Sequence, residues 1–349
     1  MQKWAHGLTA AILLVILLSG CGGGGENADE GISNSRLATV KDRGELICGV
    51  SGQLPGFSFV DENGNYFGLD VAICRAISAA LFDDPQAVEF RNLNAKERFT
   101  AVQSGEVDIL SRNTTWTTSR DTSIGMEFAP IVFYDGQGIM VKKDSGITSL
   151  ADLEGRSICV QTGTTTEQNL ADQMRRRGIN YTPLVFEDVN ITFATYAQGR
   201  CEAVTADRSG LVSRRSALPS PNNHIILDQV LSKEPLAPAV ANNDSAWFDV
   251  VQWNVFALIY AEELGITSEN VAEMANRDSP KIARFLGKQG ALGEGLNISN
   301  DFAARIIRHV GNYGEIYSRN LGSDTELNLP RGQNRLWNNG GLMYSPPFR

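Results

Sequence analysis

Three short polar segments stand where apolar stretches end, and together they carry the residue types that bind a small charged molecule. Residues 113–120 read Asn-Thr-Thr-Trp-Thr-Thr-Ser-Arg and follow an apolar stretch at 107–110. Residues 161–167 follow a second stretch at 157–161, and Asp207 follows a third at 203–205. Open α/β sheets bind ligands at the carboxyl ends of their strands. We therefore expect these segments to face one another across a ligand cleft.

The charges in these segments match a ligand that carries both signs. Arg120 presents a planar guanidinium that fits a carboxylate bidentately, and Asp207 offers a carboxylate to an ammonium group. Gly163 permits a tight turn, and Thr164 with Glu167 fits a capping box, which leaves free backbone N–H groups at a helix start. An α-amino acid has the two charges that this arrangement requires.

Other site chemistries find little support in the sequence. The three histidines, His6, His224 and His309, lack the spacing of metal ligands. No Gly-x-Ser-x-Gly elbow and no phosphate-binding glycine-rich loop with lysine is present. We expect neither a metal nor a cofactor. Asp207 is the one clear candidate for a catalytic acid, which keeps an enzyme of the dehydratase kind as an alternative.

Strands and helices that alternate along the chain must position these segments. This alternation predicts parallel sheets flanked by helices. In the first half we expect a hairpin around Asn63-Gly64 and a helix capped by Asp70. The predicted strands of this half are 46–50 and 107–110, and its predicted helices are 70–81 and 97–104. In the second half the predicted strands are 157–161, 181–185 and 203–205, and the predicted helices are 149–153 and 166–177.

Two such runs predict an α/β fold of two lobes. The chain is expected to cross from one lobe to the other near 134–138 and to return near 236–241, ahead of a long helix at 246–264. The predicted boundaries are 36–137 for lobe 1, 138–238 for lobe 2 and 239–349 for the return to lobe 1. The tail from Gly322 is rich in Gly, Asn and Pro, and Trp337 and Tyr344 are its expected anchors.

The first residues have the order of a secretory signal. Lys3 precedes an apolar stretch at 8–18 that is too short to span a membrane, and small residues lead into Cys21. We expect 1–20 to be removed and Cys21 to be acylated, with 21–35 as a flexible tether. An ordinary signal peptide with a chance cysteine is the alternative.

Charge and cysteine content agree with an exported binding protein. The net charge is −9, and an acidic chain without clustered Lys and Arg does not bind nucleic acid. Apart from Cys21, the remaining four of the five cysteines fall into two groups, Cys48 with Cys74 and Cys159 with Cys201. An oxidising compartment allows one disulfide in each lobe, and four free thiols are the alternative.

Longer stretches resemble a known family. Residues 57–71, 101–108 and 163–165 are similar to the polar amino-acid-binding proteins of ABC importers, which have the two-lobed type II periplasmic-binding-protein fold with two hinge strands. Residues 116–123, 135–138, 310–315 and 331–337 resemble the branch that binds L-amino acids broadly and carries a C-terminal extension. The resemblance implies a monomeric receptor that delivers an L-amino acid to permease subunits.

The resemblance also implies a role for individual residues. Arg120 would bind the α-carboxylate together with the hydroxyl and N–H of Thr115 and the N–H of Thr165. Asp207 and the carbonyl of Asn113 would hold the ammonium. The residues expected near the ligand side chain are Arg98, Phe57, Ser51 and Gln161.

Alternative roles exist for some of these residues. Asp207 could cap a helix or pair with Arg208, Arg98 could be an exposed partner of an acidic residue, and Phe57 could belong to the core. A sensor domain is a third function class, although the spanning helix or signalling domain that it normally needs is not evident in the sequence.

Overall fold

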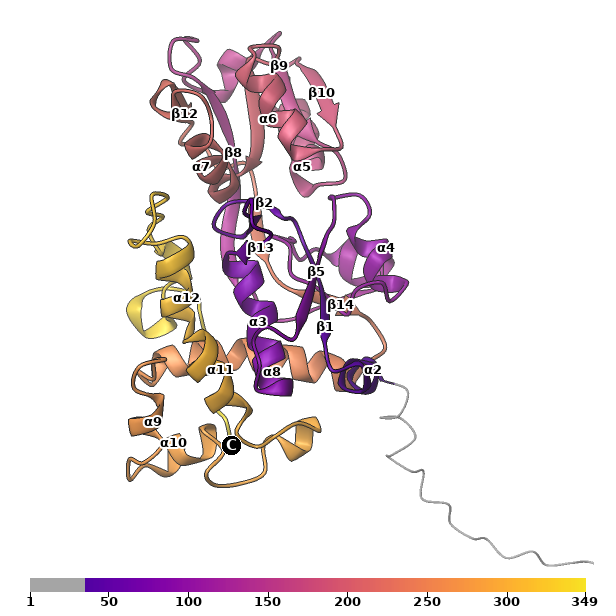
Figure 1. The fold of residues 1–349 in the computed structure, drawn as a ribbon. Coiled ribbons are helices and arrows are strands. Elements are labelled where there is room, and N and C mark those ends of the chain that lie inside the picture. The colour runs from indigo at the N-terminus through magenta and orange to yellow at the C-terminus, as the bar shows by residue number, and fades with distance from the viewer. Residues whose placement is uncertain (1–34) are drawn as a thin grey trace, which may run out of the picture.

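The computed structural model describes residues 35–349 and shows two lobes joined by extended strands (Figure 1). The predicted signal segment and Cys21 lie outside the described residues. Each lobe has one main sheet with helices packed on it, so the predicted two-lobed α/β fold is confirmed.

The sheet of lobe 1 is mixed. Its strands lie in the order β5 (Val88–Asn92), β1 (Leu46–Val50), β6 (Ile109–Leu110), β14 (Ala239–Ala241) and β7 (Met126–Phe128). The first three are parallel, and β14 is antiparallel to both of its neighbours. A small antiparallel sheet of β2 (Gln53–Leu54), β3 (Ser58–Val60) and β4 (Tyr66–Phe67) contains the predicted hairpin.

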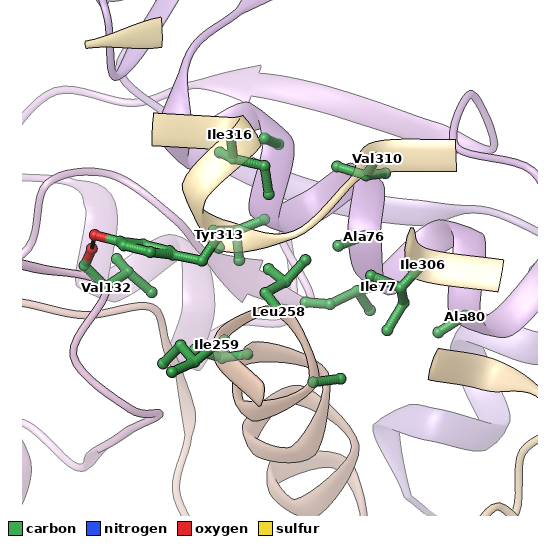
Figure 2. Close-up of a cluster of buried hydrophobic side chains, with 14 of the residues drawn as sticks. Ala76, Ile77, Ala80, Val132, Leu258, Ile259, Ile306, Val310, Tyr313 and Ile316 are labelled. Carbon is green, nitrogen blue, oxygen red and sulfur yellow. Dashed lines mark hydrogen bonds between the residues drawn. The ribbon is translucent and has the colours of Figure 1, made fainter. Parts of the chain in front are cut away.

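The helices of lobe 1 come from both ends of the chain. From the first part come α2 (Arg36–Arg43), α3 (Leu69–Phe82) and α4 (Arg98–Gln103). The returning chain adds α8 (Ser245–Glu263), α9 (Val271–Met274), α10 (Pro280–Phe285), α11 (Phe302–Val310) and α12 (Tyr313–Asn320). Figure 2 shows their contact, in which Ile77 of α3 and Leu258 of α8 lie beside Ile306 of α11. The hydroxyl of Tyr313 donates to the Val132 carbonyl at 2.6 Å. This bond fixes α12 to the segment just ahead of the strand that leaves lobe 1.

The sheet of lobe 2 follows the same plan. Its strands lie in the order β10 (Thr182–Phe186), β9 (Ser157–Gln161), β11 (Ala203–Asp207), β8 (Phe133–Lys142) and β12 (His224–Ile226). Its helices are α5 (Thr165–Arg177), α6 (Val189–Ala197) and α7 (Arg208–Ser216). Side chains alternate across a strand, so Ile158 and Val160 pack toward α5 while Cys159 packs toward α6 and α7.

Two strands join the lobes. The second half of β8 pairs with β11 in lobe 2, whereas its first half pairs with β13 (Lys233–Leu236), which carries the chain back. Phe133 and Leu236, at the lobe 1 ends of these strands, belong to the core of lobe 1. Figure 1 shows β8 running from one lobe into the other. β8 and β13 are thus the two connections between the lobes, in the place of the two hinge strands that the resemblance implies.

Both predicted disulfides are present. Cys48 of β1 is bonded to Cys74 of α3, and Cys159 of β9 is bonded to Cys201, which lies just ahead of β11. Each lobe therefore has its own crosslink between neighbouring elements, and no disulfide ties the two lobes to each other among the described residues.

Two local predictions were wrong. Helix α3 begins after Gly68 without a side-chain cap, and Asp70 lies within its first turn. The Asp70 carboxylate instead accepts the backbone N–H of Asn113 at 3.0 Å, so it supports the loop after β6. In the tail, Trp337 and Tyr344 are 50% and 58% exposed, and the buried anchors are Leu336, Met343 and Phe348.

Candidate functional site

The cleft between the lobes collects most of the predicted site residues. From lobe 1 it is lined by Ser51, Arg98, Asn113 and Thr115, and from lobe 2 by Gln161, Thr165 and Asp207. These residues stand at or just beyond the ends of β1, β6, β9 and β11, apart from Arg98, which begins α4. The carboxyl edges of both sheets thus open on one cleft.

Arg120 lies immediately behind this wall. It is on a short π-helical turn (Ser119–Ser123), a distortion that often marks functional positions. Its guanidinium is buried, donates from Nη1 to the Thr115 carbonyl at 2.8 Å and stacks 5.2 Å from the Phe99 ring. Burial lowers the pKa of Arg120, and Glu234 and Asp207 oppose that shift. Arg120 therefore fixes Thr115 and places a positive charge beside it.

The hydroxyls of Thr115 and Thr165 are already occupied. They lie 3.3 Å apart across the cleft, and both donate to Oε2 of Glu234, at 2.6 and 2.8 Å. Hydrogen bonds among the described residues leave the backbone N–H groups of both threonines unused. An incoming carboxylate would meet these two N–H groups, so the hydroxyl role predicted for Thr115 requires Glu234 to release it.

Glu234 is a buried carboxylate on the hinge strand β13 that sequence reasoning missed. It is 1% exposed, and its Oε1 accepts Asn169 Nδ2 at 2.8 Å and the Ser232 hydroxyl. Four side chains thus satisfy one carboxylate, and Thr115 comes from the opposite lobe to Asn169. Its place two residues ahead of the predicted return to lobe 1 at 236–241 was the available signal.

Asp207 occupies the lobe 2 side of the same cleft. It precedes α7 but makes no side-chain cap there, and Arg208 donates instead to the Leu227 carbonyl at 2.7 Å. Burial raises the pKa of Asp207 well above its usual range, and the nearby carboxylates of Asp135 and Glu234 raise it further. A cation bound at this carboxylate would remove that penalty.

Asn113 connects Asp207 with lobe 1. Its backbone has a positive φ of 30°, a region that asparagine adopts more readily than most residues. Its Nδ2 lies 3.4 Å from Oδ2 of Asp207, and its N–H is held by Asp70. Burial raises the pKa of Asp70 to about 7, although the Asn113 N–H and the Arg112 charge oppose the increase.

The remaining predicted residues differ in position. Arg98 is only 3% exposed and donates to Thr114 Oγ1 at 3.3 Å, so it is not a surface residue. Gln161 donates to the Glu187 carbonyl at the cleft rim. Phe57 is buried in the lobe 1 core against Phe133 and does not line the cleft, where Leu54 stands instead.

Two further arginines line the cleft that the sequence did not single out. Arg112 follows β6 directly and donates from Nε to the Leu93 carbonyl at 2.7 Å. Arg214 comes from α7 in lobe 2 and is also buried. Isolated arginines are normally solvated surface residues. Only the position of Arg112 beyond a strand end, and of Arg214 two helical turns after Asp207 on the same face, could have indicated them.

The lobes touch directly around the cleft, so the structure is a closed form. Lys96 of lobe 1 pairs with Glu187 of lobe 2 at 2.8 Å, and the Ser213 hydroxyl donates to the Pro55 carbonyl at 2.7 Å. Gly163 has a φ of +74°, and a Cβ there would lie 3.3 Å from the carbonyl of Ala95 in the other lobe. Glycine thus allows both the turn and the close approach of the lobes.

At the start of α5, half of the predicted capping box is present. The Thr164 hydroxyl accepts the N–H of Glu167 at 3.1 Å, as expected. The Glu167 carboxylate, however, accepts the N–H of Gly163 at 3.0 Å and not that of Thr164. The turn at Gly163 is therefore held from the helix, with its donor end directed at the cleft.

Residues 35–349 contain neither a cluster of metal-ligating side chains nor a helix suited to a membrane. No group of three or more His, Cys, Asp or Glu side chains is placed to hold a metal ion there. Within the same range, none of the helices combines the length and the apolar character needed to cross a membrane.

Known proteins with similar sequences include two that bind amino acids. The chain is 51% identical over 319 residues to the general L-amino acid-binding periplasmic protein AapJ of Rhizobium johnstonii, covering 91% of this chain and 94% of that one. It is 48% identical over 318 residues to the glutamate/glutamine/aspartate/asparagine-binding protein BztA of Rhodobacter capsulatus, with coverage of 91% and 94%.

A solved structure gives the same result for the fold. A periplasmic binding protein of an ABC transporter from Brucella ovis, with glutathione bound, superposes with a TM-score of 0.88 at 50% identity, covering 90% of this chain and 99% of that one. Residues 46–321 match the model of a family described as bacterial extracellular solute-binding proteins, family 3. This chain belongs to that family.

Proposed function

We propose that the protein captures L-α-amino acids between its lobes and delivers them, in the closed form, to the permease of an ABC importer. The observation that carries the proposal is the placement of opposite charges on the two sides of one cleft: Asp207, at the end of β11, lines it in lobe 2, and Arg120 lies just behind the lobe 1 wall, where it holds the carbonyl of the cleft residue Thr115. A zwitterion that reached both would hold the lobes together. The names of AapJ and BztA support this ligand class.

The proposed contacts follow from the free donors and acceptors. The ligand α-carboxylate lies against the N–H groups of Thr115 and Thr165, within the field of the Arg120 guanidinium. The ammonium is bound by Asp207 and the Asn113 carbonyl. Charge-assisted hydrogen bonds of this kind contribute about 1.5–3 kcal/mol each, and closure removes the water that would weaken them.

The proposal includes the chain's location and form. The protein acts outside the cytoplasmic membrane as a monomer, held there by lipid on Cys21 after removal of residues 1–20. Lobe 1 comprises 36–137 and 239–349, and lobe 2 comprises 138–238. Mass spectrometry of the protein purified from its native membrane tests the anchor, because acylation adds lipid mass to a peptide that begins at Cys21.

A second candidate ligand is glutathione, which the Brucella ovis relative contains. The observation that favours it is a second hollow beside the cleft, which shares Ser51, Arg112 and Gln161 with it and extends toward Asn92 and Glu187. A γ-glutamyl group has the same α-amino acid end, so it could use the same contacts while its remainder occupied the second hollow.

Calorimetry with matched ligands tests the proposal. L-Glutamine should bind, whereas analogues that lack only the ammonium or only the carboxylate should bind at least about thirtyfold more weakly, since each leaves a buried charge unpaired. The ligand should be recovered unchanged after incubation, because binding without turnover is proposed. Failure to bind any of the twenty amino acids, or conversion of a ligand to product, would refute it.

A further inference from the structure

The C-terminal extension contacts one of the two strands that join the lobes. Residues 331–337 lie beyond 46–321, the range that matches the family model, so their contacts lie outside the part that this model describes. Asn334 is 3% exposed. Its Oδ1 accepts the backbone N–H of Tyr134 in β8 at 2.6 Å, and its Nδ2 donates to the Tyr134 carbonyl at 3.2 Å. One side chain therefore binds both main-chain groups of a residue in the crossing strand.

A side-chain amide suits this position because it has the donor and the acceptor of a peptide group. Residues 133–136 of β8 pair with β13 on one side, and no other strand among the described residues pairs with them. The other side is therefore an open strand edge, whose N–H and C=O groups need partners where water is excluded. Asn334 takes the place of a neighbouring strand there.

The helices of lobe 1 hold Asn334 in place through Arg331. Arg331 donates from Nε and Nη2 to the Asn334 carbonyl, at 2.9 and 2.7 Å. Its guanidinium also donates to both carboxylate oxygens of Glu262 in α8, at 3.1 and 3.2 Å. It lies 5.1 and 4.9 Å from the rings of Tyr313 and Tyr317 in α12. We call Arg331 and Asn334 the tail clamp, and it is anchored on two helices of lobe 1.

The tail clamp fixes the point at which β8 leaves lobe 1. Two residues before Tyr134, the Val132 carbonyl is already held by Tyr313 (Figure 2). Three residues after Tyr134, Gln137 donates at 2.8 Å to the carbonyl of Thr166 in lobe 2. The backbone between residues 134 and 137 is therefore where β8 can change direction when the lobes move.

The clamped residue is also connected to the predicted ligand loop, by way of the second hinge strand. Tyr134 lies opposite Pro235 in β13. The Pro235 carbonyl accepts the N–H of Trp116 at 2.8 Å, and Leu236 forms an antiparallel bridge with Thr115, which lines the cleft. Extension, β8, β13 and ligand loop thus lie side by side as one layer.

We propose that Asn334 is a positioning residue for ligand capture, which fixes the lobe 1 end of the hinge and limits the arrangements that the lobes sample without ligand. This inference rests on the proposed function. A hinge that is fixed in advance loses less conformational freedom when the lobes close, and the ligand therefore binds more tightly. The extension contributes to affinity in this way without touching the ligand.

Two measurements on variant proteins test the inference. In Asn334→Ala, the affinity for L-glutamine, measured by calorimetry, should fall at least about fivefold, because closure then orders a looser hinge. Without ligand, the backbone amides of 113–116 and 132–136 should exchange hydrogen faster, and those of 157–161 in lobe 2 should not. Asn334→Asp keeps the acceptor for the Tyr134 N–H and should lose less affinity. Asn338→Ala, at an exposed position of the same extension, is the control and should change neither measurement.

A purely structural role of Asn334 predicts different results. Phe348→Ala also removes a buried side chain of the extension, and it should lower stability while affinity is kept. If Asn334→Ala speeds exchange in the tail alone, or loses no more affinity than Phe348→Ala, the inference is overturned. Faster exchange at 132–136 with a smaller loss of affinity than expected would refute the positioning role and leave the proposed function standing. If the unmodified protein binds no amino acid, the proposed function fails, and the role in affinity fails with it.

Discussion

Arg120 serves its own loop as well as the proposed ligand, because its Nη1 holds the Thr115 carbonyl. We expect Arg120→Ala to weaken amino-acid binding by about 2–5 kcal/mol, or roughly thirtyfold to several-thousandfold, since the ligand carboxylate would be buried without a cation. Calorimetry measures the loss. Arg120→Lys keeps the charge without the planar fork and should lose less. A loss below threefold in Arg120→Ala would remove it from the site.

Asp207 should make binding depend on pH. Burial and two neighbouring carboxylates raise its pKa in the ligand-free closed form, whereas a bound ammonium favours the ionised carboxylate. Below the ligand-free pKa the ligand must displace a proton, so affinity should fall as pH decreases, by up to about tenfold per pH unit. Titration calorimetry from pH 8 to pH 5 measures this slope. Asp207→Asn should bind weakly and with little slope. An unchanged affinity across that range would contradict the role.

The sequence predicted positions of residues at strand ends better than the directions of their side chains. Seven of its candidates reach one cleft, and all but Arg98 do so because parallel strands share a carboxyl edge. Phe57 does not, since the hairpin beside it turns the ring into the core. Glu234, Arg112 and Arg214 were missed because their burial depends on segments, distant in sequence, that meet only in the folded protein. No local pattern reports such contacts.

At the scale of elements, buried parallel strands were the clearest features. The bounds of β1 and β9 agree with prediction because such strands are continuous apolar runs between polar ends. Helix starts were less certain. The Asp70 side chain could have capped α3, but Asn113 N–H from a distant loop takes its carboxylate. A long-range partner thus overrides a local capping preference.

The role of strand β13 in closure can be tested at Glu234. Its carboxylate accepts Thr115 from lobe 1 and Thr165 and Asn169 from lobe 2, which favours the closed form. We expect Glu234→Gln to weaken ligand binding about tenfold, because an amide replaces one acceptor oxygen by a donor and removes the charge that strengthens these bonds. Small-angle scattering with saturating ligand should still show closure, at higher ligand concentration.

The control for this prediction lies on the same strand. Lys233 is exposed, so Lys233→Gln should leave affinity and closure unchanged. Tighter binding in Glu234→Gln would show instead that the carboxylate repels the ligand and that the threonine hydroxyls are freed by its removal. That result would mean that the Glu234 carboxylate favours the open form of the protein over the closed one.

At the scale of the whole molecule, the last residues complete lobe 1. The Phe348 ring is 4% exposed and lies 5.0–5.2 Å from the rings of Trp253, Tyr260 and Phe285. Composition alone favoured the larger aromatic residues, Trp337 and Tyr344, as anchors. They pack against each other at the surface, while the smaller side chains fill the gaps that α8 and α10 leave.

Removing this anchor should therefore destabilise the fold without altering the site. We expect Phe348→Ala to lower the free energy of unfolding by about 3–5 kcal/mol, the usual cost of deleting a buried phenylalanine ring, as measured by urea denaturation. Amino-acid affinity at 25 °C should stay within threefold, because α8 and α10, which carry the other rings of the cluster, lie on the side of lobe 1 away from lobe 2 (Figure 1). Tyr344→Ala, at an exposed ring, should cost less than about 1 kcal/mol. Equal losses in the two variants would mean that the tail packs as a surface segment and adds nothing specific to the core.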